Sequence, residues 1–458
     1  MRRNPGQPGT RWEFRVFPRF FMMLRASRRT NRARRSDSKI YFVPVNFRPY
    51  TPFHQRHKVP YMEHKKAKYS AVGTRVADSF ARGHRPRHSK RRSGDQMVKH
   101  AVAALLGAGV AAGAWAQSSV TLYGSLDAGV AYVNNAGGGA KWSMIQGNTQ
   151  PDRWGLKGVE DLGGGLKAIF QLENGFYTNS GQMAAAGTMW NRQAFVGLNS
   201  DKLGTLTLGH QTPFNFDWLD PLSTAFLAQS WYAFHPGNLD QLADTSTVPF
   251  NNSVKYRSPT YAGFTAGAML GFGNTTNFST GRTMSFGVNY ANGPFKAAAV
   301  YSNEHDQAFS MATVGGIAGP GGTFQGMPVA NYVAKKAENM GAGLSYQFGP
   351  LLVHGLYTRV KLQANGHSDT FQSYDTGANY QTSPFNVIAG GAATSTLAGR
   401  RWTQFELGDT YSLSKRTQLY ANVLYEHASG NAKAAFFTAG VSSTANQVIL
   451  LAGIHHSF

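Results

Sequence analysis

The chain of 458 residues contains no cysteine, so it has neither a disulfide framework nor a thiolate metal site. It also lacks any run of about 18 consecutive apolar residues, the length that a membrane-spanning helix needs. No H-E-x-x-H, G-x-S-x-G or phosphate-loop pattern occurs, and these are common signatures of enzymes. His455 and His456 are neighbours, and neighbours on a strand point to opposite faces, so they cannot bind one metal there. We therefore predict a protein that is not an enzyme, with no cofactor, no metal site and no catalytic residue.

Acidic residues are scarce in one part of the chain only. Residues 1–96 contain 25 Lys and Arg against 5 Asp and Glu, whereas residues 117–458 contain 19 against 18. The formal charge of +22 therefore lies almost entirely in 1–96, a stretch that prolines interrupt and that shows no periodicity. We interpret 1–96 as sequence read from an upstream start codon. The alternative is a disordered basic arm that binds nucleic acid or lipid headgroups; for the rest of the chain we expect no nucleic-acid partner.

Residues 97–116 have the three regions of a cleavable secretory signal. A basic start at Met97–His100 precedes an apolar run of Ala, Leu, Gly and Val, and the segment ends in Ala114-Trp115-Ala116. The apolar run is too short to remain as an anchor. We predict cleavage after Ala116, so that residues 117–458 form the mature domain.

The mature part repeats one plan, in which about ten residues of alternating polarity lead to a tight turn, a second alternating run and a longer loop. This plan is typical of a transmembrane antiparallel β-barrel, whose short turns lie on the periplasmic rim and whose long loops lie outside. It predicts an all-β barrel of about 16 strands, wide enough for a water-filled lumen. The expected strands are 120–133, 141–160, 165–176, 188–199, 204–211, 251–258, 263–272, 281–290, 295–304, 338–347, 351–361, 370–381, 385–391, 400–411, 416–427 and 446–458.

Aromatic residues recur at the ends of these runs. Tyr256, Tyr290, Tyr346 and Tyr411 each precede a tight turn, which favours a girdle at the membrane interface. Ordinary cross-strand aromatic pairing is the alternative. The last strand alternates apolar residues up to the terminal Phe458, as the closing strand of a barrel would.

Alternation also predicts which basic residues face the lumen. The phase that directs Trp154 and Leu156 to lipid directs Arg153 and Lys157 inward. A charge on the lipid face near the membrane midplane costs about 2–4 kcal/mol, so lumenal positions or positions near a rim are expected. Taken singly, each of these residues is equally well explained as a solvated charge at a rim.

Two further strands follow the same argument. If Phe195 points to lipid, Arg192 lies inside, and Lys255 lies inside because Val254 and Tyr256 flank it. We predict that Arg153, Arg192, Lys255 and Lys157 form a basic wall of the pore.

The longest connection of the mature part runs from about 212 to 250 and shows no alternation. A loop of this length is usually functional or disordered, and its aromatic residues favour packing inside the lumen. Folded inward, it would oppose acidic groups to the basic wall and so screen solutes by size and charge. Its carboxylates, which could equally be turn formers and caps, are Asp217, Asp220, Asp240 and Asp244.

Four segments together resemble the general-diffusion porins of Gram-negative outer membranes, in particular the branch with smaller pores that often prefer anions. They are V-T-L-Y-G-S-L-D-A-G-V at 120–130, R-W-G-L-K-G-V-E-D-L-G-G-G-L-K-A-I-F-Q-L-E at 153–173, N-R-Q-A-F-V-G-L at 191–198 and N-S-V-K-Y at 252–256. With the terminal Phe458, the resemblance covers 117–458.

The resemblance implies a sixteen-stranded homotrimer in the outer membrane, an inward-folded third loop and a basic cluster that includes Arg153, Arg192 and Lys255. It further implies outer-membrane lipids, lipopolysaccharide and the barrel assembly machinery as partners, the last of which would read Phe458 as an assembly signal. Where related sequences read Gly-Arg-Gln, this chain has His210 in place of Arg, so one wall charge would depend on pH.

We therefore expect a passive diffusion channel for small hydrophilic solutes and ions, with a weak preference for anions. Two alternatives stay open. One is a surface adhesin or receptor whose loops around 305–337 and 428–445 bind a partner. The other is a substrate-specific channel for sugars or organic acids, for which Trp218, Trp231 and Tyr232 would provide an aromatic path.

Overall fold

The computed structural model describes residues 118–243, 248–318 and 321–458. The chain divides into two compact units, 1–91 and 92–458, and the first lies wholly outside the described residues. The proposed extension 1–96 and the signal peptide 97–116 also lie outside them, so both stay predictions.

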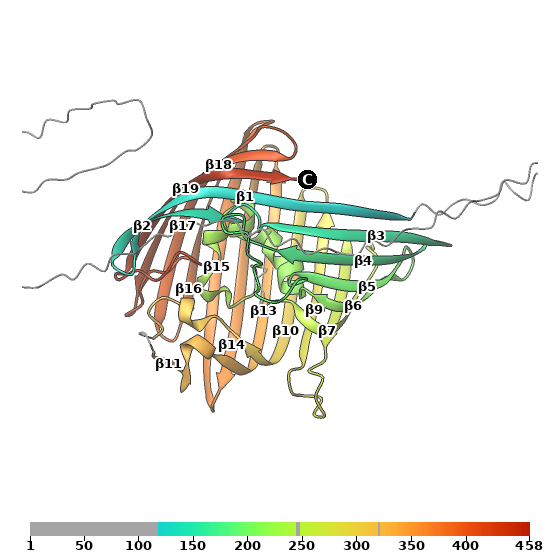
Figure 1. Cartoon of the computed structure of the whole chain (residues 1–458), viewed down its shortest axis with the longest axis horizontal. Helices are drawn as coiled ribbons and strands as arrows, with labels where there is room; N and C mark the ends of the chain where they lie inside the picture. Colours follow the sequence, from blue (N-terminus) through green and yellow to red (C-terminus); the bar gives the residue numbers. More distant parts are fainter. Residues whose placement is uncertain (1–117, 244–247, 319–320) are drawn as a thin grey trace, which may run out of the picture. The chain divides into compact units, whose positions relative to one another are not determined.

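The described part of the second unit is a β-barrel whose strands run antiparallel (Figure 1). Its wall is built from β1 (Ser119–Ala136), β2 (Gly139–Gln146), β3 (Arg153–Gly163), β4 (Leu166–Gly175), β5 (Gln193–Ser200), β6 (Gly204–Gln211), β7 (Phe250–Arg257), β8 (Phe264–Gly271), β9 (Thr283–Asn292), β10 (Phe295–Ala308), β13 (Val333–Phe348), β14 (Leu351–Ala364), β15 (His367–Ser383), β16 (Asn386–Leu397), β17 (Arg400–Ser412), β18 (Thr417–Ser429) and β19 (Asn446–Ser457).

The first and last strands close the wall, because β1 pairs with β19 from Ser125↔Ser457 to Val133↔Ile449. On its other edge β1 pairs with two segments in succession: β3 along 119–125 and β2 along 128–136. β2 and β3 therefore occupy one position of the wall. The strands of the described residues thus form a closed barrel of sixteen positions, which confirms the predicted fold class.

Two predicted strands differ from the observed ones. The expected strand 141–160 is interrupted at 147–152, where Gly147 has a positive φ of 66° and the amide of Thr149 donates to the Asp127 carboxylate at 2.8 Å. The expected strand 188–199 begins only at Gln193, because the side chain of Asn191 turns back to accept from the amide of Gly175 at 2.9 Å. In both places a side chain replaces the ladder as the backbone's partner, which polarity alternation does not reveal.

The two rims differ in their connections. One rim carries seven short connections, at 164–165, 201–203, 258–263, 293–294, 349–350, 384–385 and 413–416. The other rim carries long segments such as 176–192, 212–249, 309–332 and 430–445. Three connections of the loop rim are tight turns as well, at 137–138, 365–366 and 398–399. Around the rim with the short turns, the side chains of Tyr256, Tyr346 and Tyr411 are exposed. On the same rim, Tyr290 packs on Phe264 with ring centroids 4.5 Å apart. The tyrosines thus serve both as rim residues and as cross-strand partners.

Several long loops fold back over the lumen. The segment 309–332 contains η5 (Met311–Thr313), η6 (Val329–Asn331) and the hairpin β11 (Thr323–Phe324) and β12 (Met327–Pro328), and its apolar side chains pack into a buried cluster with Leu239 and Trp402. No helix among the described residues is long and apolar enough to span a membrane.

Candidate pore constriction

The connection between β6 and β7 is the constriction loop (residues 212–249), and its described residues, 212–243 and 248–249, lie inside the barrel (Figure 1). Its aromatic and leucine side chains at Phe214, Trp218, Leu219 and Leu222 are buried in the main apolar cluster. The expected inward fold is confirmed. Within it lie η1 (Asn215–Leu219), η2 (Asp220–Leu222), α2 (Thr224–Leu227), η3 (Trp231–Ala233) and η4 (Pro236–Asn238).

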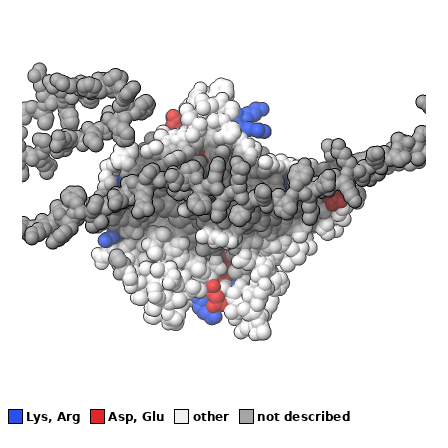
Figure 2. Space-filling model, viewed as in Figure 1, with Lys and Arg blue, Asp and Glu red and all other residues white. Residues whose placement is uncertain are grey.

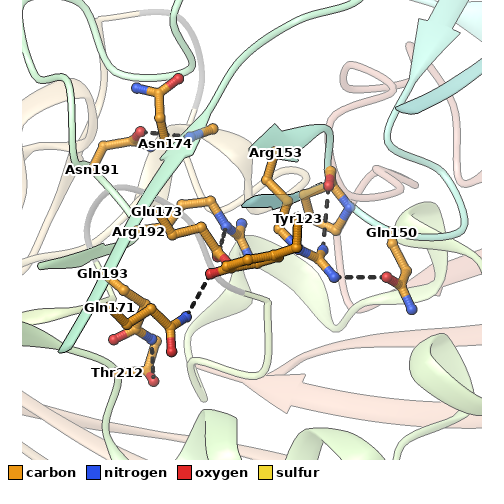
Figure 3. A network of polar contacts seen from close by, with 12 residues as sticks. Tyr123, Gln150, Arg153, Gln171, Glu173, Asn174, Asn191, Arg192, Gln193 and Thr212 are labelled. Carbon is orange, nitrogen blue, oxygen red and sulfur yellow. Dashed lines mark hydrogen bonds and ion pairs between the residues drawn. The ribbon is translucent and has the colours of Figure 1, made fainter. Parts of the chain in front are cut away.

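A cluster around Glu173 of β4 forms one side of the lumen (Figure 3). Arg192 Nε lies 2.7 Å from Glu173 Oε1, and Arg153 Nε lies 3.8 Å from Oε2. The Tyr123 hydroxyl donates to Glu173 at 2.7 Å and accepts from Gln171 at 2.8 Å. Glu173 thus lies between two guanidinium groups, and its pair with Arg192 is a short, charge-assisted hydrogen bond. The Arg153 guanidinium instead donates to Gln150 Oε1 at 2.7 Å.

Glu173 and Tyr123 were not among the expected site residues. A signal for them exists, because Gln171 and Glu173 alternate with Phe170 and Leu172, so the polar pair shares one face of β4. Lys157 completes this side, with its Nζ 5.2 Å from the centre of the Tyr123 ring. The predicted inward direction of Arg153 and Lys157 agrees with these contacts.

Arg192 reaches the lumen for a different reason from the one its sequence indicates. Phe195 pairs with Gln171 across β4 and β5 and lines a lumenal cavity, so it points inward, while Val196 and Leu198 are exposed to lipid. The phase assigned to this strand was therefore wrong. Arg192 precedes β5 in a bend, where alternation no longer applies.

A second basic position lies three strands further along the wall from β4, at Lys255 of β7. Its Nζ lies 2.5 Å from Asp217 Oδ2 and donates to the backbone carbonyl of Thr212 at 2.8 Å. The predicted inward position of Lys255 is correct, and its partner is a carboxylate of the constriction loop. Arg257, two residues further along the same face, lies 5.8 Å from the Trp218 ring and is a basic group that the predictions omitted.

Two adjacent cavities lie between the basic groups and the loop. The first, about 540 Å³, is lined by Lys255, Arg257 and Asp217; the second, about 270 Å³, is lined by Arg153, Glu173 and Arg192. Both cavities share the walls Gln171, Gln193, Phe216, Asp220 and Phe226. Charged groups of both signs therefore border one continuous set of lumenal surfaces.

The four predicted acidic residues of the loop do not share one environment. Asp217 and Asp220 line the cavities, although Asp220 is largely buried. Asp240 is fully buried and accepts from Thr358 of β14 at 2.6 Å, so it ties the loop to the wall instead of facing the pore. Asp244 lies outside the described residues.

Asp240 belongs to a buried polar anchor of the constriction loop. His235 Nδ1 lies 2.6 Å from Asp240, and its Nε2 lies 3.4 Å from Asp375 of β15. Burial by itself would lower the pKa of His235, but the carboxylates of Asp240 and Asp375 outweigh it and raise the pKa to about 10. The imidazole is thus held as a cation between two carboxylates.

His210 does not join the basic wall. It lies on the face of β6 that carries the exposed Leu206 and Leu208, and its ring bonds Asn251 at 2.7 Å and the carbonyl of Asn191 at 3.1 Å. The expected pH-dependent wall charge at this position is therefore wrong. Among the described residues no cluster of three or more His, Asp or Glu could hold a metal ion.

Phe458 is positioned by the closing strand pair. Its amide and carbonyl exchange hydrogen bonds of 3.1 Å with Gly124 of β1, and its side chain is partly exposed. The ring is therefore presented at the outer surface of the seam between β1 and β19.

Comparison with known proteins gives matches over most of the chain. The family model described as Gram-negative porin matches residues 101–431. An outer membrane porin protein of Bordetella pertussis is 33% identical, with 79% of this chain and 100% of the relative covered. Outer membrane porin protein 32 of Delftia acidovorans is 29% identical over the same shares.

Solved structures give the same picture. The anion-selective porin from Comamonas acidovorans matches with a TM-score of 0.62 and 28% identity, covering 75% of this chain and 100% of that chain. OmpT of Vibrio cholerae, described in a trimer form, matches with a TM-score of 0.55 at 14% identity and so shares the fold.

Proposed function

The chain belongs to the Gram-negative porin family, and from that membership we propose that its outer-membrane pore has a weak preference for anions, set by the basic groups around the constriction loop. The protein is a porin, a passive channel of the outer membrane.

The balance of charge at the two cavities carries the proposal. Four basic groups, Arg153, Arg192, Lys255 and Arg257, and three acidic groups, Glu173, Asp217 and Asp220, line the two cavities. A fifth basic group, Lys157, lies on the same side of the lumen over the Tyr123 ring. The excess is positive but small, and most of the charges are paired at short range, which favours weak rather than strong selectivity. The solved relative described as anion-selective supports the same sign.

The test is the reversal potential of a double variant in a salt gradient. Arg153→Gln with Arg192→Gln removes two positive charges and leaves Glu173 unpaired, so we expect a shift toward cations. The matched variant Glu173→Gln removes the shared partner and is expected to shift selectivity toward anions. If neither variant moves the reversal potential of a folded pore, these residues do not control selectivity.

Two further properties concern the assembly and the length of the chain in the membrane. We propose a homotrimer, which the trimer form of the distant OmpT supports through the shared fold; chemical cross-linking of the purified protein would test it. We also propose that the chain in the membrane begins at Gln117, which the N-terminal sequence of protein isolated from outer membranes would decide. A longer chain would contradict cleavage after Ala116.

A further inference from the structure

A further cavity, named the outer pocket, adjoins the constriction on the side of the loop rim. It has a volume of about 590 Å³, and its walls include parts of the long loops 176–192 and 430–445. It shares Pro151, Arg192 and Trp231 with the smaller cavity of the constriction, so the two spaces are neighbours. A solute that enters from the loop rim therefore meets the outer pocket before the constriction. The volume is that of an ordinary small-molecule site.

Aromatic rings from three separate segments line the outer pocket. Trp231 and Tyr232 come from η3 of the constriction loop, Phe176 and Tyr177 from the loop after β4, and Phe437 from the loop before β19. All of them except Phe437 keep exposed surface. Rings that are accessible inside a cavity offer stacking surfaces to a planar ligand. The outer pocket is therefore suited to an aromatic solute.

Contacts on several sides hold Trp231 in place. Its backbone amide donates to the carbonyl of Asn148 at 2.7 Å. Its ring meets Phe234 edge-on, with centroids 5.3 Å apart, and the centroid of Phe437 is 5.7 Å away. A ring that is fixed in advance loses little freedom when a ligand binds, which favours affinity. Trp218, which we expected on the same aromatic path, is instead buried and takes no part in the outer pocket.

One cation of the outer pocket has no partner in the protein. Lys141 of β2 shares a ladder row with the buried Val133, so its side chain points to the lumen, whereas the next residue, Trp142, is exposed on the outer face. Within the part of the chain that the structure describes, the Lys141 ammonium forms no ion pair. On the surface visible in Figure 2, charged side chains are few and lie near the margins of the barrel. An unpaired lumenal cation therefore does not belong to a generally positive surface.

The other charged groups of the outer pocket already have partners. Arg192 lies 2.7 Å from Glu173. The carboxylate of Asp152 accepts from the amide of Asp127 at 2.7 Å and from the amide of Thr178 at 2.8 Å. Among the described residues that line the pocket, Lys141 is thus the cation that remains for a ligand, which favours an acid over a neutral sugar.

Tyr232 adds a hydrogen-bond donor to the ring surface. Its hydroxyl forms no hydrogen bond with another residue of the described ranges. Burial raises the pKa of Tyr232 to about 12, so the hydroxyl keeps its proton at neutral pH and can donate to an anion. The pocket therefore combines stacking surface, a free ammonium and a free hydroxyl.

We propose that the outer pocket binds a small aromatic carboxylate, with its ring against Trp231 and Tyr232 and its carboxylate on Lys141. A charge-assisted contact of this kind orients the acid, while the rings distinguish it from an aliphatic acid of the same charge. Binding ahead of the constriction would raise the local concentration of the acid at the entrance to the narrow part of the pore. The site does not depend on which inorganic ion the pore prefers.

The experiment measures block of single-pore current in a planar bilayer by three probes at constant ionic strength. The probes are benzoate, cyclohexanecarboxylate, which has the charge without the aromatic ring, and benzyl alcohol, which has the ring without the charge. The folded full-length protein is used, with the probe in both compartments. Wild type is expected to bind benzoate about fivefold more tightly than either of the other probes.

Three variants separate charge, hydroxyl and ring. Lys141→Gln is expected to weaken benzoate about fivefold and to leave benzyl alcohol unchanged. Tyr232→Phe keeps the ring and is expected to weaken benzoate about threefold. Trp231→Leu keeps an apolar side chain and is expected to weaken benzoate and benzyl alcohol alike. The conductance without probe shows that each variant has folded.

Matched controls and contrary outcomes complete the test. Lys202→Gln removes a charge from the short-turn rim, and Trp142→Leu removes an exposed ring from the outer face of β2; neither should alter block. Equal block of wild type by benzoate and cyclohexanecarboxylate overturns the proposal, as does equal block of wild type and Lys141→Gln by benzoate. Block by maltose without block by benzoate would make the pocket a sugar site and overturn it too. A cation-preferring reversal potential with benzoate block as expected would contradict only the proposed ion preference.

Discussion

At the scale of single residues, selectivity depends on which charges are already paired. Arg192 and Glu173 form a short, largely buried pair, and removing one partner of such a pair leaves an uncompensated charge. The field in the lumen therefore reflects the whole cluster of Arg153, Arg192 and Glu173. Single substitutions here change both the local charge and the positions of the neighbours.

The pair of Lys255 and Asp217 gives a cleaner prediction, because Asp217 remains partly exposed to the cavity. Lys255→Gln should lower the ratio of anion to cation permeability about two- to fivefold, and Asp217→Asn should raise it by a similar factor, corresponding to about 0.4–1 kcal/mol. The measurement is the reversal potential of each variant in the same salt gradient, with Lys202→Gln at the rim as control. Shifts of the same sign would show that the pair acts through loop position and not through charge.

At the scale of elements, the position of the constriction loop depends on glycines of the wall strands, which allow loop side chains to pack close to the backbone. Gly287 of β9 faces the lumen, and a Cβ built there would lie 2.7 Å from Cε3 and Cζ3 of Trp218. Glycine on a strand often marks such a close approach. At Gly341 of β13 a Cβ would lie 2.6 Å from Leu219 Cδ1, so two strands make space for neighbouring loop residues.

Gly287→Val should therefore push Trp218 and the loop from the wall. We expect a loss of about 1–3 kcal/mol in folding free energy, as for overpacked cores, seen as a lower temperature for the electrophoretic shift from folded to unfolded barrel. Single-channel current should also become noisier. Gly355→Ala is the control, because the nearest atom to a Cβ there is 3.9 Å away. If Gly287→Val pores show the current noise and the unfolding temperature of wild type, the packing of Trp218 on Gly287 does not hold the loop in place.

The anchor of His235 predicts a dependence on pH. Its pKa is raised in the fold to about 10, from about 6.5 in an unfolded chain, so its stabilising contribution is complete below about pH 6.5 and is lost as pH rises through about 10. We expect open-channel noise of wild type to grow between these values.

His235→Gln removes the cation between Asp240 and Asp375 and should be noisy already at pH 6.5, with a cost of about 3–5 kcal/mol in stability. The rim variant His210→Gln should behave as wild type. The measurement is current noise of single pores from pH 6 to 10. Identical pH profiles of current noise for wild type and His235→Gln would exclude this anchor as the source of the pH-dependent noise.

At the scale of the whole molecule, polarity alternation predicted the barrel because lipid and water act on opposite faces of every strand. The sixteen expected strands correspond to the sixteen wall positions, and the expected strand 385–391 lies within β16 except for its first residue. The prediction weakened where side chains bond the backbone, as at Asn191 and Asp127.

The constriction was less predictable for a physical reason. Its partners are far apart in sequence: Asp240 meets Thr358, and Thr224 meets Asp375. Period-two patterns assign a face to a strand residue but not a position to a loop residue, so Asp240 and Asp217 looked alike. Arg257 and Glu173, in contrast, lie on regular strands and could have been found by continuing the alternation from Lys255 and Gln171.

The central claim is that the pore passes ions with a weak preference for anions set by an excess of basic groups. The most direct test is the reversal potential of the folded wild-type protein in a planar bilayer under a salt gradient. We expect stepwise conductance and a reversal potential whose sign shows a preference for anions. Its magnitude should lie well below that of an ideally anion-selective pore. A potential of the sign for cations would place selectivity with Glu173, Asp217 and Asp220 and contradict the claim.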